Sequence, residues 1–96
     1  MKESKILSET LLPVFRNAAE NRYSWRLRFA IAENASSLSQ YVDKQVVDTE
    51  ILNLYELLLR DNEPEVRSEA VDKVPTVAKF CSTDLLVDKI LPIIKE

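Results

Sequence analysis

The 96-residue sequence predicts an all-α fold, an α-α superhelix of about two and a half repeats built from five antiparallel helices. The chain is 46% hydrophobic and 30% charged and has no Gly, a composition that favours long helices joined by short polar turns. Its apolar residues recur three and four positions apart, which is the spacing of one helix face. The segment Val66-Arg67 also follows Leu27-Arg28 after 39 residues (67 − 28), and a period near 40 residues is typical of two-helix repeats.

The first predicted helix spans residues 4–19. Its apolar face consists of Leu7, Leu11, Leu12, Phe15, Ala18 and Ala19. Either Ser4 or Ser8 is the expected N-cap, because a hydroxyl can accept a hydrogen bond from the free amides of the first turn. Pro13 falls inside the pattern and removes one backbone hydrogen bond, a defect of about 3 kcal/mol in an isolated helix. We therefore expect a bend at Pro13.

A short polar turn at residues 20–23 follows, so the two flanking helices are expected to be antiparallel neighbours. Ser24 is the predicted N-cap of a second helix, which begins at Trp25 and runs to about Ser39. The expected inner stripe of this helix is Leu27, Ala30, Ile31, Asn34, Ala35 and Leu38.

A longer connection at residues 41–47 leads to a third helix, for which Asp48 is the predicted N-cap. The inner stripe of this helix is Ile51, Leu52, Tyr55, Leu58 and Leu59. A second polar turn occupies residues 60–63. Pro64 then suits the first position of the fourth helix, where a missing amide hydrogen costs nothing.

The fourth helix is expected from Pro64 to about Cys81, with a bend at Pro75. Its inward residues are Val66, Ala70, Val71, Val74, Val77 and Ala78. Ser82 or Thr83 is the expected cap of a fifth helix, which has Pro92 in its interior. The apolar face of that helix is Leu86, Ile90, Leu91, Ile93 and Ile94.

The repeat is visible in both sets of helices. Leu12, Leu52 and Leu91 are equivalent, and the spacings of 40 (52 − 12) and 39 (91 − 52) place one extra residue in the first turn, around Tyr23. We divide the chain into a first repeat at about residues 4–42, a second at about 48–81, and the first helix of a third at about 83–96. Each repeat buries its apolar face only against its neighbours, so the uncovered ends are expected to permit self-association.

Composition excludes several functions. A net charge of −3 and a pI of about 5.0 are opposite to the basic stripe of nucleic-acid binders, so we expect no nucleic-acid partner. The chain has one Cys and no His or Gly, which excludes a Cys/His zinc site, a Ser/His/Asp triad and a Gly-rich phosphate loop. Cys81 is expected to be a small buried residue. No apolar run approaches the roughly 20 residues of a membrane span. We expect a non-enzymatic protein without cofactor or membrane contact.

The second repeat resembles the HEAT repeat in its acidic turn and in the Val-Arg pair that opens its second helix, and residues 52–77 carry most of the pattern. More narrowly, the chain resembles the scaffold (A) subunits of protein phosphatase 2A over about residues 7–96. The segments that carry this resemblance include Ser24-Trp25-Arg26-Leu27-Arg28, Glu65-Val66-Arg67 and Ile90-Leu91-Pro92-Ile93-Ile94. Two departures are the extra residue at Tyr23 and Asn21, which stands where an Asp is usual.

This resemblance implies a curved, non-catalytic array of HEAT repeats. Its expected location is the cytoplasm, and a nuclear location is also compatible with the resemblance. The resemblance also implies an exchangeable phosphatase regulatory subunit as the partner of these repeats, and a catalytic subunit bound through repeats outside this chain. The intra-repeat turns would contact the regulatory subunit. The residues in these turns that the resemblance assigns to the partner are Trp25, Arg26, Asn62, Glu63 and Glu65.

The residues themselves leave alternatives open. Trp25 is either a partner anchor, because an exposed Trp offers a large rigid area, or a lid over the small core. Arg28 and Arg67 are interpreted as structural, since each is within reach of a turn carboxylate such as Asp61. The acidic residues of the second turn and the following helix form either a solvated face or a patch complementary to a basic partner.

Two other functions compete with a phosphatase scaffold. One is a HEAT segment of a transport or chromosome-associated protein, which would have different partners. The other is a nucleic-acid enzyme built on helical repeats, which would need a basic concave face with clustered aromatic residues.

Overall fold

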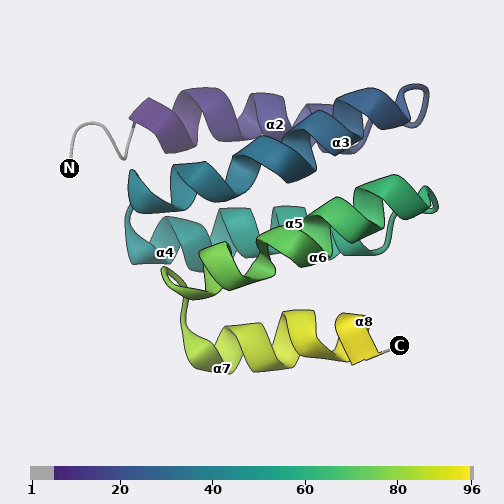
Figure 1. The fold of residues 1–96 in the computed structure, drawn as a ribbon. Helices are drawn as coiled ribbons and strands as arrows, with labels where there is room; N and C mark the ends of the chain where they lie inside the picture. The colour runs from purple at the N-terminus through teal and green to yellow at the C-terminus, as the bar shows by residue number, and fades with distance from the viewer. Residues whose placement is uncertain (1–5, 96) are drawn as a thin grey trace.

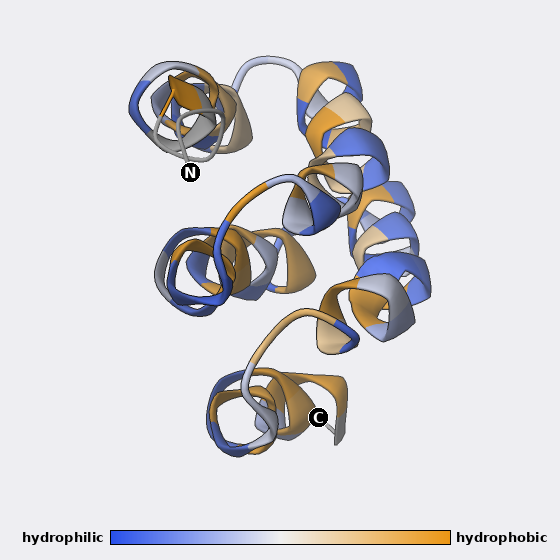
Figure 2. Cartoon of the chain, turned by 90° about the vertical axis from the view of Figure 1, so that its left-hand side faces the viewer, coloured by the Kyte–Doolittle hydropathy of each residue, from blue (hydrophilic) through white to orange (hydrophobic). Residues whose placement is uncertain are grey.

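The computed structural model describes residues 6–95 as five antiparallel helices in two layers (Figure 1). The first, third and fifth helices form one layer; their segments are η1 (Leu7–Leu11) with α2 (Leu12–Ala19), α4 (Lys44–Val46) with η3 (Val47–Ile51) and α5 (Leu52–Leu59), and α7 (Thr83–Leu85) with η4 (Leu86–Ile90) and α8 (Leu91–Lys95). The second layer consists of α3 (Trp25–Asn34) with η2 (Ala35–Gln40), and α6 (Pro64–Ala78). Figure 2 shows the two layers end on, with hydrophobic residues turned towards each other. The predicted all-α helical-repeat class is confirmed.

Each helix of the first layer contains a π-helical turn at the same phase, η1, η3 or η4, directly before an α-helical segment. Pro13 and Pro92 are the second residues of α2 and α8, so each Pro follows a π turn within its helix, and the bend expected at Pro13 stays a prediction. The π turn re-routes the backbone hydrogen bonds just before the Pro. Because η3 precedes Asn53 in the same way, the turn belongs to the repeat and not to Pro alone. Pro75 does lie inside α6.

The core lies between the layers. The predicted stripe of the third helix is confirmed, because Ile51, Leu52, Tyr55, Leu58 and Leu59 are all buried. Tyr55 spans the layers: its hydroxyl donates to the Ala32 carbonyl oxygen at 2.8 Å. Burial raises the pKa of Tyr55 to about 12, since a phenolate would be poorly solvated there.

The predicted stripes of the second layer are partly wrong. On the second helix the buried residues are Arg28, Ile31, Ala32, Ala35, Ser36 and Ser39, whereas Leu27 and Asn34 are exposed. The helix is rotated because Arg28 turns inward to reach a carboxylate of the next repeat. On α6, Val66, Ala70 and Val77 are buried but Val71 is exposed, because it lies one position off their stripe. This helix ends at Ala78, before the expected Cys81.

Two predicted N-terminal positions are confirmed. Ser24 caps α3, its hydroxyl accepting from the Leu27 amide at 3.3 Å, and Pro64 begins α6. At the first helix, Ser4 lies outside the described residues and Ser8 lies within η1 rather than at a cap.

Asp48 was predicted as the cap of the third helix, and this is wrong. The helix begins at Lys44 with Asp43 at the N-cap position. The Asp48 carboxylate instead accepts from the Ser82 amide at 2.7 Å and from the Ser82 hydroxyl at 2.6 Å. Asp48 therefore fixes the start of the last helix, one repeat further along the chain.

Cys81 is buried and unpaired, as expected, and burial raises the pKa of its thiol. None of the helices described between residues 6 and 95 combines the length and the hydrophobicity needed to cross a bilayer.

Candidate functional site

The two intra-repeat turns lie side by side at one edge of the fold, on the right in Figure 1. In the first turn the Asn21 side-chain oxygen accepts from the Tyr23 amide at 2.8 Å; in the second, Asp61 accepts from the Glu63 amide at 2.9 Å. Asn21 therefore reproduces the local geometry of Asp61 without its charge. Tyr23, the extra residue, is 99% exposed and projects from the turn into solvent.

A buried ion pair joins the turns. Arg28 is 4% exposed and Asp61 is 2% exposed. Arg28 donates from Nε and Nη2 to the two carboxylate oxygens of Asp61, at 2.6 and 3.1 Å, which is the bidentate geometry of a strong charge-assisted contact. Arg22 adds a third contact to Asp61 at 3.3 Å. The second repeat is thus held against the first at the turn edge.

Two opposing effects set the pKa of Asp61. Burial alone would raise it, but the hydrogen bonds from Arg28 and the Glu63 amide, with the charges of Arg28 and Arg22, hold the pKa of Asp61 below its ordinary value. Asp61 is consequently a fixed anion at neutral pH, and it cannot serve as a proton donor there.

Arg28 and Arg67 make equivalent contacts, each with a backbone carbonyl oxygen of the turn that precedes its helix. Arg28 donates to the Asn21 carbonyl oxygen at 2.6 Å, and Arg67 donates to the Asp61 carbonyl oxygen at 2.7 Å. The sequence separations of 7 and 6 show the extra residue of the first turn directly. Arg67 differs from Arg28 because it reaches the backbone of Asp61 and not the carboxylate, and it remains exposed.

Trp25 is neither buried as a lid nor fully free. It is 36% exposed, and its ring meets Phe29 edge to face, with ring centroids 6.4 Å apart and planes at 87°. The Arg26 guanidinium carbon lies 5.5 Å from the centre of the Trp25 ring, within cation–π range. The indole is held in place by its two neighbours while part of its surface stays accessible.

Asn62, Glu63 and Glu65 lie in and after the second turn, with Asn62 and Glu65 exposed and Glu63 half-buried. A hydrogen bond with Glu65 and its negative charge raise the pKa of Glu63, and the same hydrogen bond lowers the pKa of Glu65. The two carboxyl groups thus interact directly, and their negative charges repel each other. A cation brought by a partner would relieve this repulsion.

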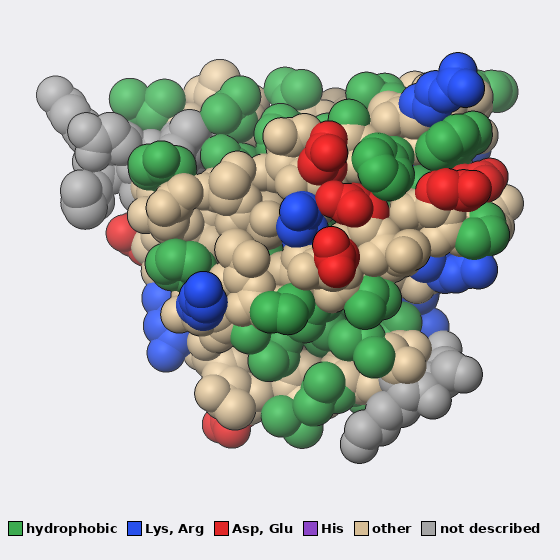
Figure 3. Space-filling model, in the orientation of Figure 1, with side chains coloured by type: hydrophobic (Ala, Val, Ile, Leu, Met, Phe, Trp, Pro, Cys, Tyr) green, Lys and Arg blue, Asp and Glu red, His purple; other side chains and the backbone are tan. Residues whose placement is uncertain are grey.

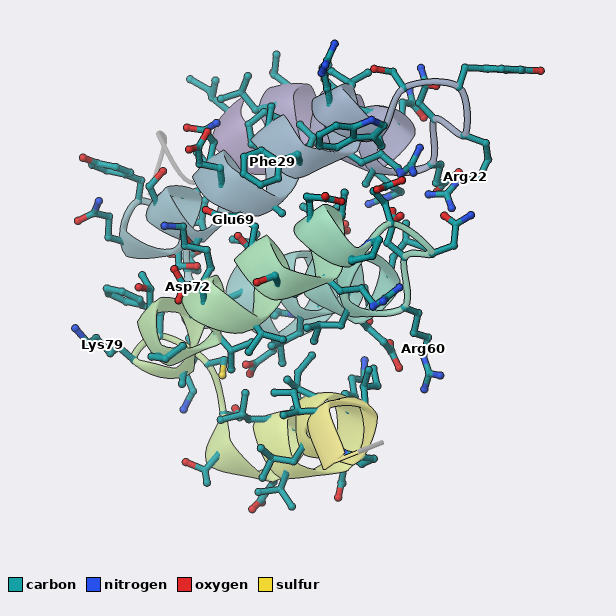
Figure 4. The ribbon with its side chains drawn as sticks, turned by 45° about the vertical axis from the view of Figure 1, so that its right-hand side comes forward. Arg22, Phe29, Arg60, Glu69, Asp72 and Lys79 are labelled. Carbon is teal, nitrogen blue, oxygen red and sulfur yellow. The ribbon has the colours of Figure 1, made fainter. Side chains whose placement is uncertain are left out.

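The outer face of the second layer carries further acidic side chains. Figure 3 shows them around a Lys or Arg in the middle of this face, and Figure 4 shows Glu69 and Asp72 projecting from α6. Glu69 pairs with Lys73 at 3.4 Å. At the described part of this face the charge is mixed with an acidic excess.

Sequence reasoning did not single out Arg22 and Phe29. Both had a usable signal: Arg22 lies one repeat period before Asp61, and Phe29 follows Trp25 by four residues, the spacing at which helix side chains meet. The five residues that the resemblance assigns to a partner all lie in or directly after the two turns.

Among residues 6–95 no group of three or more Cys, Asp or Glu side chains could hold a metal ion. The surface hollows of the described residues include one of about 400 Å³ between α2 and α5, lined by Leu12, Arg16 and Glu50 among others, and one of about 440 Å³ at the second turn. Across the first, Arg16 and Glu50 form an ion pair between repeats.

Comparison with known proteins gives one family match. The family model described as the PPP2R1A-like HEAT repeat matches residues 44–96, which is more than half of the chain. The matched segment comprises the third, fourth and fifth helices. No match was found among the curated proteins.

Proposed function

Because the chain belongs to the PPP2R1A-like HEAT-repeat family, and is thus a HEAT-repeat scaffold segment, we propose that it presents its two intra-repeat turns to a regulatory subunit of a phosphatase 2A-like holoenzyme. The observation that carries this proposal is the turn edge itself. The buried pair of Arg28 and Asp61 joins the two turns, so that residues from both repeats form one surface of fixed shape. Its role is positional, and no chemical step is assigned to the chain.

Trp25 is the anchor of this surface. Binding a partner usually costs entropy because side chains become ordered, but the contacts with Phe29 and Arg26 already order the indole. The remaining exposed area can be buried at little further cost. Such a pre-positioned Trp next to an Arg has the character of a binding hot spot.

The neighbouring acidic pair defines the complementary chemistry. Glu63 and Glu65 present two adjacent carboxyl groups, and the hydrogen bond with Glu65 and its negative charge raise the pKa of Glu63. A Lys or Arg of the partner would offset the repulsion between the two carboxylates. We therefore expect the partner to contribute an apolar pocket for Trp25 and a basic side chain opposite Glu63.

The competing functions receive less support. A nucleic-acid enzyme would need a basic face, whereas the face formed by α3 and α6 carries acidic side chains such as Glu69 and Asp72 (Figure 3, Figure 4). A transport or chromosome-associated HEAT segment would share the fold, but the family match is to the phosphatase scaffold type.

The proposal is tested by measuring regulatory-subunit binding to this chain by surface plasmon resonance. Trp25→Ala should weaken binding by about 30-fold, equivalent to a hot spot of about 2 kcal/mol. The matched control is Tyr41→Ala, an exposed aromatic residue (60% exposed) in the connection between repeats at the opposite edge. This control should bind as tightly as the unmodified chain.

Circular dichroism on each variant separates loss of binding from loss of fold. Equal binding by the unmodified chain and Trp25→Ala would sink the proposal, as would an equal loss in Tyr41→Ala. The phosphatase catalytic subunit alone should not bind this chain, because we expect its contacts to lie in repeats outside it.

A further inference from the structure

The first turn contains one residue more than the second, and the hydrogen bonds show which one. In the second turn Glu63 has two roles: its amide donates to the Asp61 carboxylate at 2.9 Å, and it is the N-cap residue of α6. In the first turn these roles fall to two residues. The Tyr23 amide donates to the Asn21 side chain at 2.8 Å, whereas Ser24 caps α3. Tyr23 is therefore the residue that separates the turn from the cap.

The side chain of Tyr23 has no part in holding this turn. It is 99% exposed, so the ring lies almost entirely in solvent. Other groups fix the turn on both sides: the Arg28 guanidinium donates to the Asn21 carbonyl oxygen at 2.6 Å, and the Ser24 hydroxyl accepts from the Leu27 amide at 3.3 Å. No residue in the described part of the chain has a positive φ, so the extra residue is accommodated without backbone strain. The ring is presented to solvent by a turn whose hydrogen bonds do not involve it.

The residues on either side of Tyr23 are basic and aromatic. Arg22 and Arg26 are both exposed, and no carboxylate occurs between residues 22 and 26. Arg22 lies at the turn edge (Figure 4), and its side chain is 52% exposed. Trp25, on the same segment, is also accessible. Tyr, Trp and Arg are the residue types that most often dominate the binding energy of an interface, so this segment has the composition of an interface centre.

A Tyr at this position is better explained by binding than by the turn. A residue that only lengthens a turn needs a small polar side chain, such as Ser or Asn, because these form turns readily. A Tyr instead leaves the apolar area of its ring in water. Burying that ring against a partner orders only two side-chain torsions, and the backbone that carries it is already fixed. The extra residue therefore adds a contact at low entropic cost.

We propose that Tyr23 is a second anchor on the turn edge, and that it selects a partner with an apolar pocket rimmed by carboxylates opposite the first turn. This inference rests on the proposed function, in which the turn edge binds a phosphatase regulatory subunit. The ring of Tyr23 enters the pocket, while Arg22 and Arg26 face the carboxylates. Glu63 and Glu65 give the second turn the opposite charge. A partner bound in the reverse orientation would meet like charges at both turns, so the charges also fix its orientation.

The test is surface plasmon resonance with a phosphatase 2A regulatory subunit over the immobilised 96-residue chain. Tyr23→Ser keeps the length of the turn but removes the ring, and it should weaken binding by about tenfold. Tyr23→Phe keeps the ring and should weaken binding by less than about threefold. Deletion of Tyr23 gives the first turn the length of the second, with Ser24 in both roles, and should weaken binding about as much as Tyr23→Ser. The matched control is Tyr41→Ser, which removes another exposed Tyr (60% exposed) and should leave binding unchanged.

Two variants of Arg26 test the carboxylate rim. At low salt, Arg26→Gln should slow association by about threefold, because a charge that steers the partner is lost. Arg26→Lys keeps the charge and should associate as fast as the unmodified chain. High salt should remove the difference between the two variants. Equal association rates of the two variants at low salt would overturn the carboxylate rim.

Trp25→Ala, measured alongside, separates this inference from the proposed function. If Trp25→Ala weakens binding and Tyr23→Ser does not, the proposed function stands and the anchor role of Tyr23 is overturned. If neither variant weakens binding, or if the unmodified chain does not bind, both are overturned. A loss of affinity on deletion of Tyr23 but not in Tyr23→Ser would assign the effect to the length of the turn and would also overturn the role of the ring. The circular dichroism of the Tyr23 variants should match that of the unmodified chain, because the side chain that they change is exposed.

Discussion

The buried pair between the repeats allows a precise test with Asp61→Asn. Asn keeps the shape of the side chain and the acceptor that the Glu63 amide uses, as Asn21 shows at the first turn. The substitution therefore removes the charge and leaves the turn. Arg28, 4% exposed, then remains buried without a counter-ion.

Breaking a buried ion pair on one side typically costs about 3–5 kcal/mol. Here the Asn21 carbonyl oxygen still accepts from Arg28, and the new amide oxygen can accept one further bond, so we expect a loss of about 2–4 kcal/mol in the free energy of unfolding. A protein of this length has a total stability of about 5–14 kcal/mol. The substitution should thus remove a large part of the stability at neutral pH.

Urea unfolding followed by circular dichroism measures this loss, and the midpoint should fall by about 1–2 M. Asp72→Asn is the matched control, because Asp72 is exposed on α6, and it should change the stability by less than about 0.5 kcal/mol. A double variant with Arg28→Met should lose less than the sum of the two single variants, because the two residues are in contact.

The stability that Asp61 contributes should decrease as the pH falls. The pKa of Asp61 is lower in the folded than in the unfolded chain, so its contribution is present above the ordinary Asp value of about 3.9 and is lost as pH falls below it towards the folded pKa. The stability difference between the unmodified chain and Asp61→Asn should therefore shrink in acid. A difference below about 0.5 kcal/mol at pH 7, or one that does not change on acidification, would refute the reasoning.

Two further contacts give predictions of the same kind. Tyr55→Phe removes the hydroxyl that donates to Ala32 and should cost about 1 kcal/mol in urea unfolding, whereas Tyr41→Phe at the surface should cost almost nothing. Because burial raises the pKa of Tyr55 to about 12, its contribution is complete below the unfolded value of about 10 and is lost between about 10 and 12. Unfolding experiments across that range should show a loss that Tyr55→Phe lacks. Asp48→Ala removes the acceptor of the Ser82 amide and hydroxyl, so amide hydrogen exchange in α7 and η4 should accelerate. The control Asp88→Ala, which lies in the last helix itself, should leave that exchange unchanged. Equal exchange rates in the unmodified chain, Asp48→Ala and Asp88→Ala would show that Asp48 does not hold the last helix.

Much of the fold follows from local pattern. The five helices, their antiparallel order and the one-residue insertion at Tyr23 are all readable from spacing, because a helix must place its apolar residues on one face to bury them. The buried stripe of the third helix and the cap at Ser24 follow from the same short-range rules. At the candidate site, the turn residues and the contact of Arg28 with Asp61 could be predicted from the sequence, because the repeat places equivalent positions next to one another.

The sequence by itself thus determined the class, the period and the edge at which the turns gather. Only the tertiary structure decided which way each second-layer helix faces, that Asp48 holds Ser82 of the following repeat, and that Trp25 rests half-exposed against Phe29. Local spacing specifies an apolar face, but it does not specify which partner satisfies a buried polar group. Arg28 and Asp61 are 33 residues apart and Asp48 and Ser82 are 34 apart, so these contacts form only when neighbouring repeats pack, and the need to pair a buried charge then sets the rotation of the helix.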